Sequence, residues 1–368
     1  MTRVGLNLLY LAPGNTGGME TYARALVPRL PAAWPQARFT VFAGCELAAE
    51  WRRHPWHRAV GLVEVPVSAS TRVRRAVAEQ TLLAGALARH RVDLVHSLAS
   101  TTPLLVRART VVTVHDLIYK RFPDAHAGML ARGVALLVPL AARRADRVIT
   151  ESWATAEDLG RFLGVPAEKV DVVPGGPGAD LAAAPTPETE LRERLGLPAG
   201  PLVLSPSAHR PHKNLERLIE AMRSVDATLV LPGYATPFDA ELRERADGTR
   251  VVLTGWLSDA DLEGLYRLAT CLAFPSLAEG FGLPVLEAMR RGLPVACADT
   301  TSLPEVAGDA ALLFDPLETG AIAGALRRLI GDDGLRHDLA ARGRERAERF
   351  SWEKAAEETV ASYRSALS

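Results

Sequence analysis

The stretch Cys271–Glu287, CLAFPSLAEGFGLPVLE, joins a short apolar run to an amphipathic run through a turn that contains two glycines. Cys271–Phe274 is continuously apolar, as expected of a strand buried on both faces of a parallel sheet. Gly280 and Gly282 let the backbone turn tightly and approach a ligand without an intervening Cβ atom. Pro284 suits the first turn of a helix, where its missing N–H group is no loss. The stretch therefore predicts a strand, a tight turn and a helix, the unit of doubly wound α/β domains.

The chemistry of this turn indicates a bound diphosphate. The N–H groups and the dipole at the start of a helix attract phosphate oxygens. Glu287 follows Glu279 by eight residues, and a carboxylate placed beyond a phosphate site can accept hydrogen bonds from ribose hydroxyls. The alternative is a glycine-rich strand-to-helix turn in which both glutamates are incidental.

Similar alternation of strands and helices runs through the first half of the chain. Strands are expected at Val4–Leu9, Phe39–Phe42, Val92–His96, Thr110–His115 and Arg147–Thr150. Helical spacing is found at Glu20–Leu30, Val73–His90, Met129–Arg143 and Trp153–Leu163. The segment Val172–Glu190 is rich in proline and glycine, which is typical of a linker.

The alternation then resumes. Strands are expected at Pro201–Ser205, Thr228–Leu231, Arg250–Leu253, Cys271–Phe274, Pro294–Ala296 and Ala311–Phe314. Helices are expected at Asn214–Arg223, Asp259–Leu268, Leu283–Arg291 and Thr319–Leu329, with a mostly helical tail from Leu335 to Leu367 that breaks at Phe350–Ser351. The pattern predicts two Rossmann-like, doubly wound parallel-sheet domains facing across a cleft, at residues 1–173 and 201–350. Residues 174–200 would link them, and the helix 351–368 would cross back to the first domain.

The longer stretch Ser276–Pro316, SLAEGFGLPVLEAMRRGLPVACADTTSLPEVAGDAALLFDP, resembles the signature of the family-four (group 1) retaining glycosyltransferases with the GT-B fold. The resemblance covers nearly the whole chain and is greatest to bacterial polysaccharide mannosyltransferases. It implies that Glu287 binds the donor ribose and that Glu279 lies near the donor sugar. It also implies that the backbone at Phe281, Gly282 and Leu283 meets the sugar and the phosphates.

A second element is Ser205–Ala221, SPSAHRPHKNLERLIEA. A lysine at the end of a strand can neutralise a departing diphosphate, although Lys213 alone could equally be a solvated side chain beside a helix capped by Asn214. The resemblance favours the first interpretation, because Lys213 falls at the family's phosphate-binding lysine. Many relatives have glycine where Ser207 stands and an arginine shortly after it. In this stretch the only arginine before Lys213 is Arg210, which we therefore take as a second phosphate ligand. His209 and His212 could bind the donor or face solvent.

Two elements of the first half complete the predicted site. Pro13–Leu26, PGNTGGMETYARAL, is a glycine-rich loop that opens a helix but lacks GxGxxG spacing. The resemblance makes Gly17 and Gly18 close-approach glycines facing the donor, whereas the alternative is a plain strand–helix turn. His115 follows a strand at the end where ligands bind in open α/β sheets. It could be a base, a hydrogen-bond donor or a core histidine; the resemblance places it near the transferred sugar, and we expect it to position that sugar.

Charge balance, cysteine content and the lack of certain motifs argue against several other classes of protein. The 368 residues carry 43 basic and 43 acidic side chains, which gives no reason to expect a nucleic-acid partner. Residues 1–180 have 22 basic and 15 acidic side chains, which favours an anionic acceptor or membrane surface on that half, or an uneven scatter of charge. The three cysteines are expected to be buried, and neither a metal motif nor a cofactor motif is found. No signal peptide or spanning segment is apparent, so we expect a cytoplasmic protein, at most peripheral at the inner membrane face.

The sequence thus predicts a metal-independent hexosyltransferase that uses a nucleotide-diphosphate sugar and retains the anomeric configuration. The resemblance to polysaccharide mannosyltransferases makes GDP-mannose the favoured donor, followed by a UDP-hexose. The acceptor hydroxyl could belong to a polysaccharide, a lipid-linked glycan or a natural product. One alternative is a non-hydrolysing nucleotide-sugar epimerase, and another is a non-catalytic nucleotide-sugar binding protein. Arginines on either side of TLLAGALA, at residues 81–88, suggest a basic amphipathic surface for a membrane or a lipid-linked acceptor. The alternative is a helix packed on the sheet, with arginines at its ends that are simply solvated.

Overall fold

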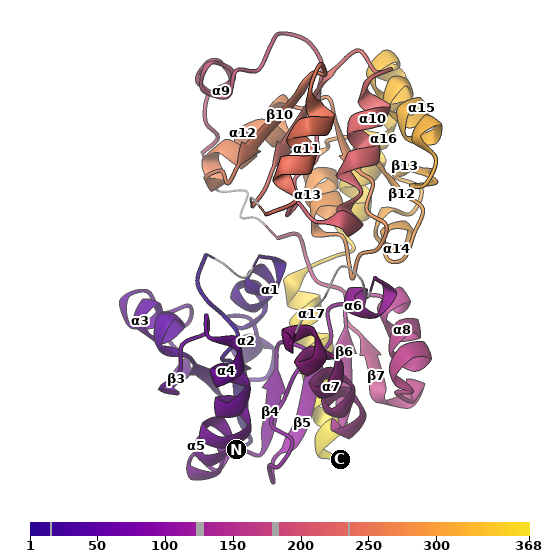
Figure 1. The fold of residues 1–368 in the computed structure, drawn as a ribbon. Helices are drawn as coiled ribbons and strands as arrows, with labels where there is room; N and C mark the ends of the chain where they lie inside the picture. The colour runs from indigo at the N-terminus through magenta and orange to yellow at the C-terminus, as the bar shows by residue number, and fades with distance from the viewer. Residues whose placement is uncertain (15–16, 123–128, 179–183, 235) are drawn as a thin grey trace. The chain divides into compact units, whose positions relative to one another are not determined.

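The computed structural model describes residues 1–14, 17–122, 129–178, 184–234 and 236–368, and for residues 129–135 it describes the backbone. The chain divides into two compact units (Figure 1). Unit 1 comprises Met1–Gly176 and Phe350–Ser368, and unit 2 comprises Pro177–Arg349. Each unit is built on its own parallel sheet.

The sheet of unit 1 has seven strands in the order β3-β2-β1-β4-β5-β6-β7. Their bounds are β1 Arg3–Leu8, β2 Arg38–Ala43, β3 Val60–Glu64, β4 Leu94–Ser97, β5 Arg109–Thr113, β6 Arg147–Thr150 and β7 Val170–Val172. The helices are α1 Gly18–Leu26, α2 Leu30–Ala33, α3 Cys45–Arg53, α4 Arg72–Ala78, α5 Ala84–Arg89, α6 Ile118–Arg121, α7 Met129–Arg144, α8 Trp153–Leu163 and α17 Trp352–Leu367. All of the strand pairs are parallel, so both faces of the sheet need covering helices.

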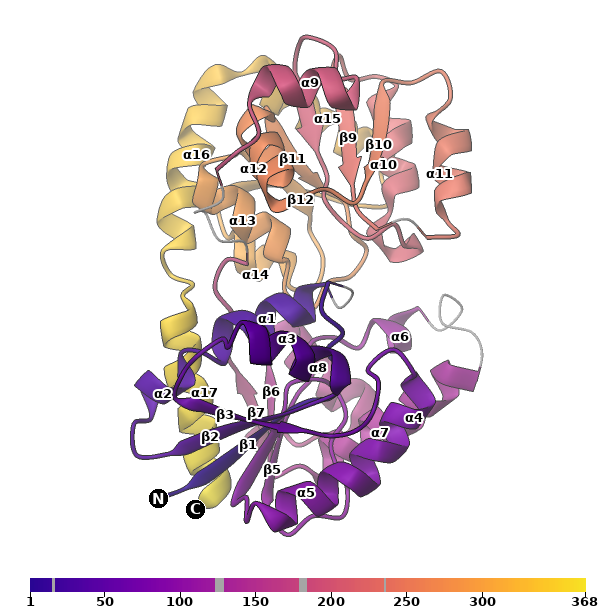
Figure 2. The same cartoon turned by 90° about the vertical axis from the view of Figure 1, so that its left-hand side faces the viewer.

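Helices cover the two faces of this sheet (Figure 2). On one face, α1 and α17 pack on strand residues that include Leu6, Val41 and Val111. On the other face, α4 and α5 pack near Phe42, while α7 and α8 pack near Val112. Neighbouring residues of one strand thus serve opposite cores, which explains why the strands are continuously apolar.

The C-terminal helix α17 is fixed to the sheet by a buried polar contact as well as by apolar packing. The Tyr363 hydroxyl lies 2.7 Å from Nδ1 of His96, and the Thr113 hydroxyl lies 2.8 Å from Nε2. Full burial lowers the pKa of His96 to about 3, so the imidazole is neutral. The last helix of the chain therefore belongs to the core of unit 1.

The sheet of unit 2 has six strands in the order β10-β9-β8-β11-β12-β13. Their bounds are β8 Leu202–Leu204, β9 Thr228–Pro232, β10 Val251–Gly255, β11 Cys271–Phe274, β12 Val295–Ala298 and β13 Ala311–Phe314. The helices are α9 Glu188–Leu195, α10 Leu215–Met222, α11 Asp239–Ala246, α12 Asp259–Leu268, α13 Leu283–Arg291, α14 Leu303–Ala307, α15 Thr319–Gly331 and α16 Asp333–Ala347. The two parallel sheets confirm the predicted doubly wound fold class.

Several local features differ from the sequence expectations. The sequence missed β3, β7, α2, α3, α6, α11 and α14, and the expected helix Val73–His90 is interrupted by a π-helical turn at Glu79–Leu83. Cys45 is exposed at the start of α3, whereas Cys271 and Cys297 are buried as expected. The described part of the segment expected as a linker includes α9, which packs against α12 through the buried Leu191.

Candidate active site

Unit 2 has a topological switch point between β8 and β11, because the chain leaves these neighbouring strands in opposite directions along the sheet. Open α/β sheets bind ligands at the carboxyl ends of the strands beside such a point. Lys213 follows β8 and Glu279 follows β11. Two residues that the sequence predicts for the donor site therefore meet at the location that the topology favours.

Lys213 and Glu279 form an ion pair. The Lys213 Nζ atom lies 2.6 Å from Glu279 Oε1, and the two side chains are 16% and 10% exposed. The ammonium group also lies 5.4 Å from the centre of the Phe274 ring. A charged hydrogen bond shielded from most of the solvent is stronger than a surface pair. The pair thus holds a positive and a negative group together in one small space.

The position of Lys213 is set by its neighbour Asn214. Lys213 ends a 3₁₀ turn, and Asn214 has a left-handed conformation with a φ of 58°. The buried Asn214 amide donates to the carbonyl oxygens of Pro275, at 3.0 Å, and Pro316, at 2.8 Å. Its side chain makes no capping hydrogen bond to α10. Asn214 therefore attaches the lysine loop to the end of β11 and does not cap the helix as considered above.

A loop after β12 holds the turn that follows Glu279. The buried Ser302 Oγ atom lies 3.1 Å from the carbonyl oxygen of Glu279 and 2.8 Å from that of Phe281, so its one proton serves both acceptors. The Glu279 N–H donates to the Thr301 hydroxyl at 3.0 Å. Thr301 has a φ of 48°, a rare conformation for a β-branched residue that costs on the order of 1–3 kcal/mol. The strained loop after β12 thus fixes the conformation of the turn after Glu279 through hydrogen bonds.

The turn leads into α13 with unused backbone donors. Gly282 has a φ of 113°, and a Cβ atom there would lie 2.8 Å from Leu303 Cδ2. The N–H groups of Val285 and Leu286 both donate to the Gly282 carbonyl. Within the described residues, the N–H groups of Gly282 and Leu283 donate to no acceptor. These donors, with the positive end of α13, can bind a phosphate group.

Glu287 is held in place on α13 by a network that the sequence did not reveal. The buried Tyr266 hydroxyl donates to Glu287 Oε2 at 2.9 Å. The Arg291 guanidinium lies 4.5 Å from the centre of the Tyr266 ring, and its Nε donates to Glu263 at 2.7 Å. Burial and the nearby Glu287 charge raise the pKa of Tyr266 well above its ordinary value, so the phenol stays a donor. The network leaves Glu287 oriented by a neutral hydroxyl.

The other polar groups near β8 differ in exposure. Arg210 is exposed, whereas His209 and His212 are both buried, so the solvent-facing alternative for these histidines is wrong. His209 Nδ1 lies 3.1 Å from Asp239, while its Nε2 atom has no partner among the described residues. The hydroxyls of Ser205, Ser207 and Ser276 are also buried without a hydrogen-bond partner within that part of the chain. Buried polar groups normally find partners, so this end of the sheet has unused hydrogen-bonding capacity.

In unit 1, His115 follows β5 and uses both ring nitrogens. Nδ1 lies 2.7 Å from Glu151 Oε2, and Nε2 lies 3.0 Å from the Leu98 carbonyl oxygen. Burial opposes protonation, but the Glu151 hydrogen bond and charge outweigh it and raise the pKa of His115. The Tyr22 ring meets the imidazole edge-on, with centroids 4.9 Å apart. Because both partners of the imidazole are acceptors, His115 is arranged to donate hydrogen bonds and not to remove a proton.

The glycine-rich loop of unit 1 is only partly described. Asn15 and Thr16 of the PGNTGG motif lie outside the described residues. Gly17 precedes α1 with φ 60° and ψ −139°, a region that is essentially restricted to glycine, and among the described residues other than its chain neighbours no atom lies within 4 Å of its would-be Cβ. Gly18 begins α1 and is exposed. The two glycines therefore leave the start of α1 open.

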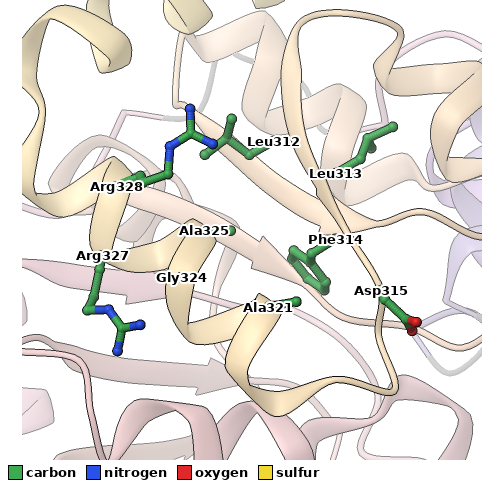
Figure 3. A pocket seen from close by; sticks show the side chains of 9 residues that line it. All are labelled: Leu312, Leu313, Phe314, Asp315, Ala321, Gly324, Ala325, Arg327 and Arg328. Carbon is green, nitrogen blue, oxygen red and sulfur yellow. The ribbon is translucent and has the colours of Figure 1, made fainter.

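A depression of about 680 Å³ lies elsewhere in unit 2, between the edge strand β13 and α15 (Figure 3). It is lined by side chains that include Phe314, Asp315 and Arg328, and by none of the predicted site residues.

Among the described residues, no group of three or more His, Cys, Asp and Glu side chains could hold a metal ion. None of the described helices has the length and apolar character needed to cross a membrane.

Family models match both units. A model described as "Glycosyl transferases group 1" matches residues 187–346, and one described as "Glycosyltransferase Family 4" matches residues 16–177. The O-antigen chain mannosyltransferase B of Escherichia coli is 31% identical over 267 residues, which are 70% of each chain. The serotype-specific mannosyltransferase WbdA of Escherichia coli is 30% identical over 260 residues, or 66% of this chain and 32% of that longer protein.

Solved structures share the fold along the whole chain. Sucrose-phosphate synthase from Thermosynechococcus elongatus has a TM-score of 0.77 at 21% identity, over 99% of this chain and 98% of that one. Anabaena HepE in complex with UDP and glucose has a TM-score of 0.75 at 22% identity, over 99% and 100% of the two chains. At these identities the likeness concerns the fold.

Proposed function

Because the chain belongs to the group 1 glycosyltransferases with the GT-B fold, a hexosyltransferase class, we propose that it moves a hexosyl group from a nucleotide-diphosphate sugar to a hydroxyl acceptor and retains the anomeric configuration. The observation that carries this proposal is the Lys213–Glu279 pair, 2.6 Å apart at the switch point of unit 2. A diphosphate needs positive partners, and Glu279 offers a hydrogen-bond acceptor beside them.

The donor diphosphate would lie between Lys213 and the start of α13. Its oxygens would be bound by two cations, Lys213 and the exposed Arg210. They would also accept hydrogen bonds from the unused N–H groups of Gly282 and Leu283. Glu287 would accept hydrogen bonds from the ribose hydroxyls, with Tyr266 holding the carboxylate in place. Glu279 and the backbone at Phe281 would contact the sugar.

Transfer would break the bond between the anomeric carbon and the diphosphate oxygen. That oxygen keeps the bonding electrons, and Lys213 with Arg210 stabilises its new charge. The acceptor hydroxyl attacks the anomeric carbon from the same face, and its proton passes to the departing phosphate oxygen. In this mechanism the protein's cations and the α13 dipole stabilise the leaving group, so we propose that no metal ion is required.

His115 would donate a hydrogen bond to the transferred sugar. Its Nδ1 atom is held by Glu151, so Nε2 is the atom that would exchange the Leu98 carbonyl for a sugar hydroxyl. Gly17 and Gly18 would let the start of α1 approach the donor without side chains in the way. These roles position the sugar and do not require His115 to act as a base.

GDP-mannose is the donor we favour, because two relatives at 30–31% identity are mannosyltransferases. A UDP-hexose is next, since HepE was solved with UDP and glucose. The O-antigen relative favours a glycan acceptor, carried on a polysaccharide or a lipid, with a natural product as a further class.

A panel of nucleotide sugars, incubated with a mannose- or glucose-terminated oligosaccharide, tests the proposal. The expected result is release of nucleoside diphosphate together with a longer oligosaccharide, whose new linkage has the donor's anomeric configuration by NMR. An isomerised donor without acceptor product would instead identify an epimerase. Donor binding without turnover, across the panel and with several acceptors, would identify a binding protein.

A further inference from the structure

One face of unit 1 carries an unusual share of exposed apolar side chains. Five of the twelve large hydrophobic side chains that the structure records as exposed lie on α4, on the turn after β4 and on α7: Val73, Val77, Leu105, Leu136 and Leu140. Leu105 is 81% exposed and Val73 is 70% exposed. We call these five residues the apolar face.

The members of the apolar face belong to one surface. Val73 and Val77 are one helical turn apart, as are Leu136 and Leu140, so each pair shares one side of its helix. Both views show α4 and α7 on the same side of the sheet of unit 1 (Figures 1 and 2). Gln80, one turn after Val77, lines a depression of about 600 Å³ together with Leu105 and Leu140. The depression therefore joins the three segments.

The π-helical turn and the turn after β4 are fixed to each other and to the sheet. The Gln80 side chain donates to the Thr102 carbonyl at 3.0 Å and accepts from the Leu104 N–H at 2.9 Å. The neighbouring Glu79 carboxylate is buried and accepts from the Asn7 amide at 2.7 Å. These bonds place Leu105 outside with its side chain in solvent, so its exposure is built into the fold.

The charge on these segments has one sign. Residues 72–91, 98–109 and 136–144 contain nine arginines and one acidic residue, the buried Glu79, and one of the nine, Arg109, is paired with Asp146. Arg72 and Arg74 lie on either side of Val73, and Arg107 follows Leu105 by two residues. Arg143 and Arg144 line the same depression as Leu140. An exposed apolar surface with cations around its edge is complementary to a partner that has negative charges at its surface and an apolar layer beneath them.

We propose that the apolar face of unit 1 docks on a lipid bilayer that contains anionic lipids. The leucines and valines enter the boundary between headgroups and acyl chains, and the arginines bind lipid phosphates while their stems lie along the apolar surface. An acidic protein would satisfy the arginines but would not need side chains as exposed as Leu105 and Val73. The bilayer explains both features. This inference does not depend on the proposed transfer reaction.

Vesicle flotation of the full chain tests the docking. The wild-type protein is expected to float with vesicles of phosphatidylcholine and phosphatidylglycerol at low salt, and to stay in solution with phosphatidylcholine alone. Raising the salt should release it, because cations near an anionic surface contribute about fivefold each to binding and are screened by ions. Failure to float with the anionic vesicles at low salt would overturn the proposal, as would equal binding to neutral vesicles.

A matched pair of double variants tests the apolar contribution. Leu105→Gln/Leu140→Gln removes two exposed leucines from the face, at 81% and 43% exposure. Leu313→Gln/Leu317→Gln removes two leucines of unit 2, at 38% and 59% exposure. The first variant should lose at least about tenfold in vesicle partitioning, while the second should match the wild type. Equal partitioning of both variants contradicts the assigned face, and unchanged melting temperatures exclude unfolding as the cause.

A second matched pair tests the charge. Arg107→Gln/Arg144→Gln lowers the charge of the face by two units and should weaken binding to anionic vesicles about 30-fold. Arg243→Gln/Arg328→Gln makes the same change in net charge on exposed residues of unit 2 and should have little effect. If both pairs weaken binding equally, the attraction is to net charge and not to this face, and the proposal fails.

Discussion

The Lys213 ammonium and the Glu279 carboxylate lie 2.6 Å apart, although 66 residues separate them in the sequence. Parallel strands β8 and β11 bring the two loops together, and Asn214 and Ser302 fix the backbone on each side. In the absence of donor, each charged group satisfies the other. A bound diphosphate would compete with Glu279 for the lysine, so the pair should tune donor and product affinity.

Glu279→Gln tests this balance. The amide keeps an acceptor for Lys213 but removes a negative charge next to the proposed diphosphate site. We expect nucleoside diphosphate to bind roughly fivefold more tightly, because a like charge is removed, while turnover falls because the sugar loses a charged acceptor. Isothermal titration with GDP and UDP measures the first effect. Glu220→Gln, on an exposed position of α10, is the matched control; equal affinities in both variants would contradict a role for the pair.

Tyr266→Phe tests the orientation of Glu287. The ring and its contact with Arg291 remain, while the hydroxyl that donates to Glu287 is lost. Losing one hydrogen bond to a charged group is worth about 1.5–3 kcal/mol, so we expect the KM for the donor to rise at least tenfold with a smaller change in kcat. Steady-state kinetics at saturating acceptor separate the two constants. A normal KM would show that Glu287 needs no positioning by Tyr266.

Ser302→Ala removes the donor that holds the carbonyls of Glu279 and Phe281. The two carbonyls lose a buried partner, so the free energy of unfolding should fall by about 1–3 kcal/mol, and donor affinity should fall with it. Urea unfolding and donor titration measure the two effects. Ser351→Ala removes the side-chain cap of α17 in unit 1, and it should lower stability without changing donor affinity.

The His115–Glu151 pair makes stability depend on pH in a defined direction. The pKa of His115 is raised in the folded state, despite burial, by the hydrogen bond and charge of Glu151, whereas the unfolded chain titrates near ~6.5. The stabilisation is therefore fully present below about pH 6.5 and is lost as the pH rises through the raised pKa. Relative to His115→Asn/Glu151→Gln, the wild type should lose free energy of unfolding as the pH rises above about 6.5. A difference that stays constant as the pH rises above about 6.5 would contradict the raised pKa.

The alternation of strands and helices could be predicted from sequence because parallel strands buried on both faces are continuously apolar. β3 and β7 escaped prediction because they are short strands at the two edges of the sheet, and apart from Val60 their residues are only partly buried or exposed. The π-helical turn in the expected helix Val73–His90 could not be foreseen. It is accompanied by a bond from Asn7, 72 residues away, to Glu79.

In the site, too, residues in local motifs could be predicted from sequence, whereas their partners from distant parts of the chain could not. Lys213, Glu279 and Glu287 stand in local motifs, so their types and spacing pointed to a diphosphate and a ribose. Their partners are Tyr266 on α12 and Thr301 and Ser302 in the loop after β12, and no local pattern marks them. The buried His209 likewise has a polar partner, Asp239, that lies 30 residues later, and no spacing rule connects the two.

The most direct test of the account is the initial rate of nucleoside diphosphate release from the accepted nucleotide sugar, with acceptor present, for wild type, Lys213→Ala and Glu287→Ala. Losing a group that stabilises leaving-group charge costs about 10²–10³ in kcat, so Lys213→Ala should lose at least about 100-fold. Glu287→Ala should mainly raise the donor KM, and Lys354→Ala, an exposed lysine of α17, should match the wild type. Wild-type rates for both Lys213→Ala and Glu287→Ala would contradict the assignment of the donor site.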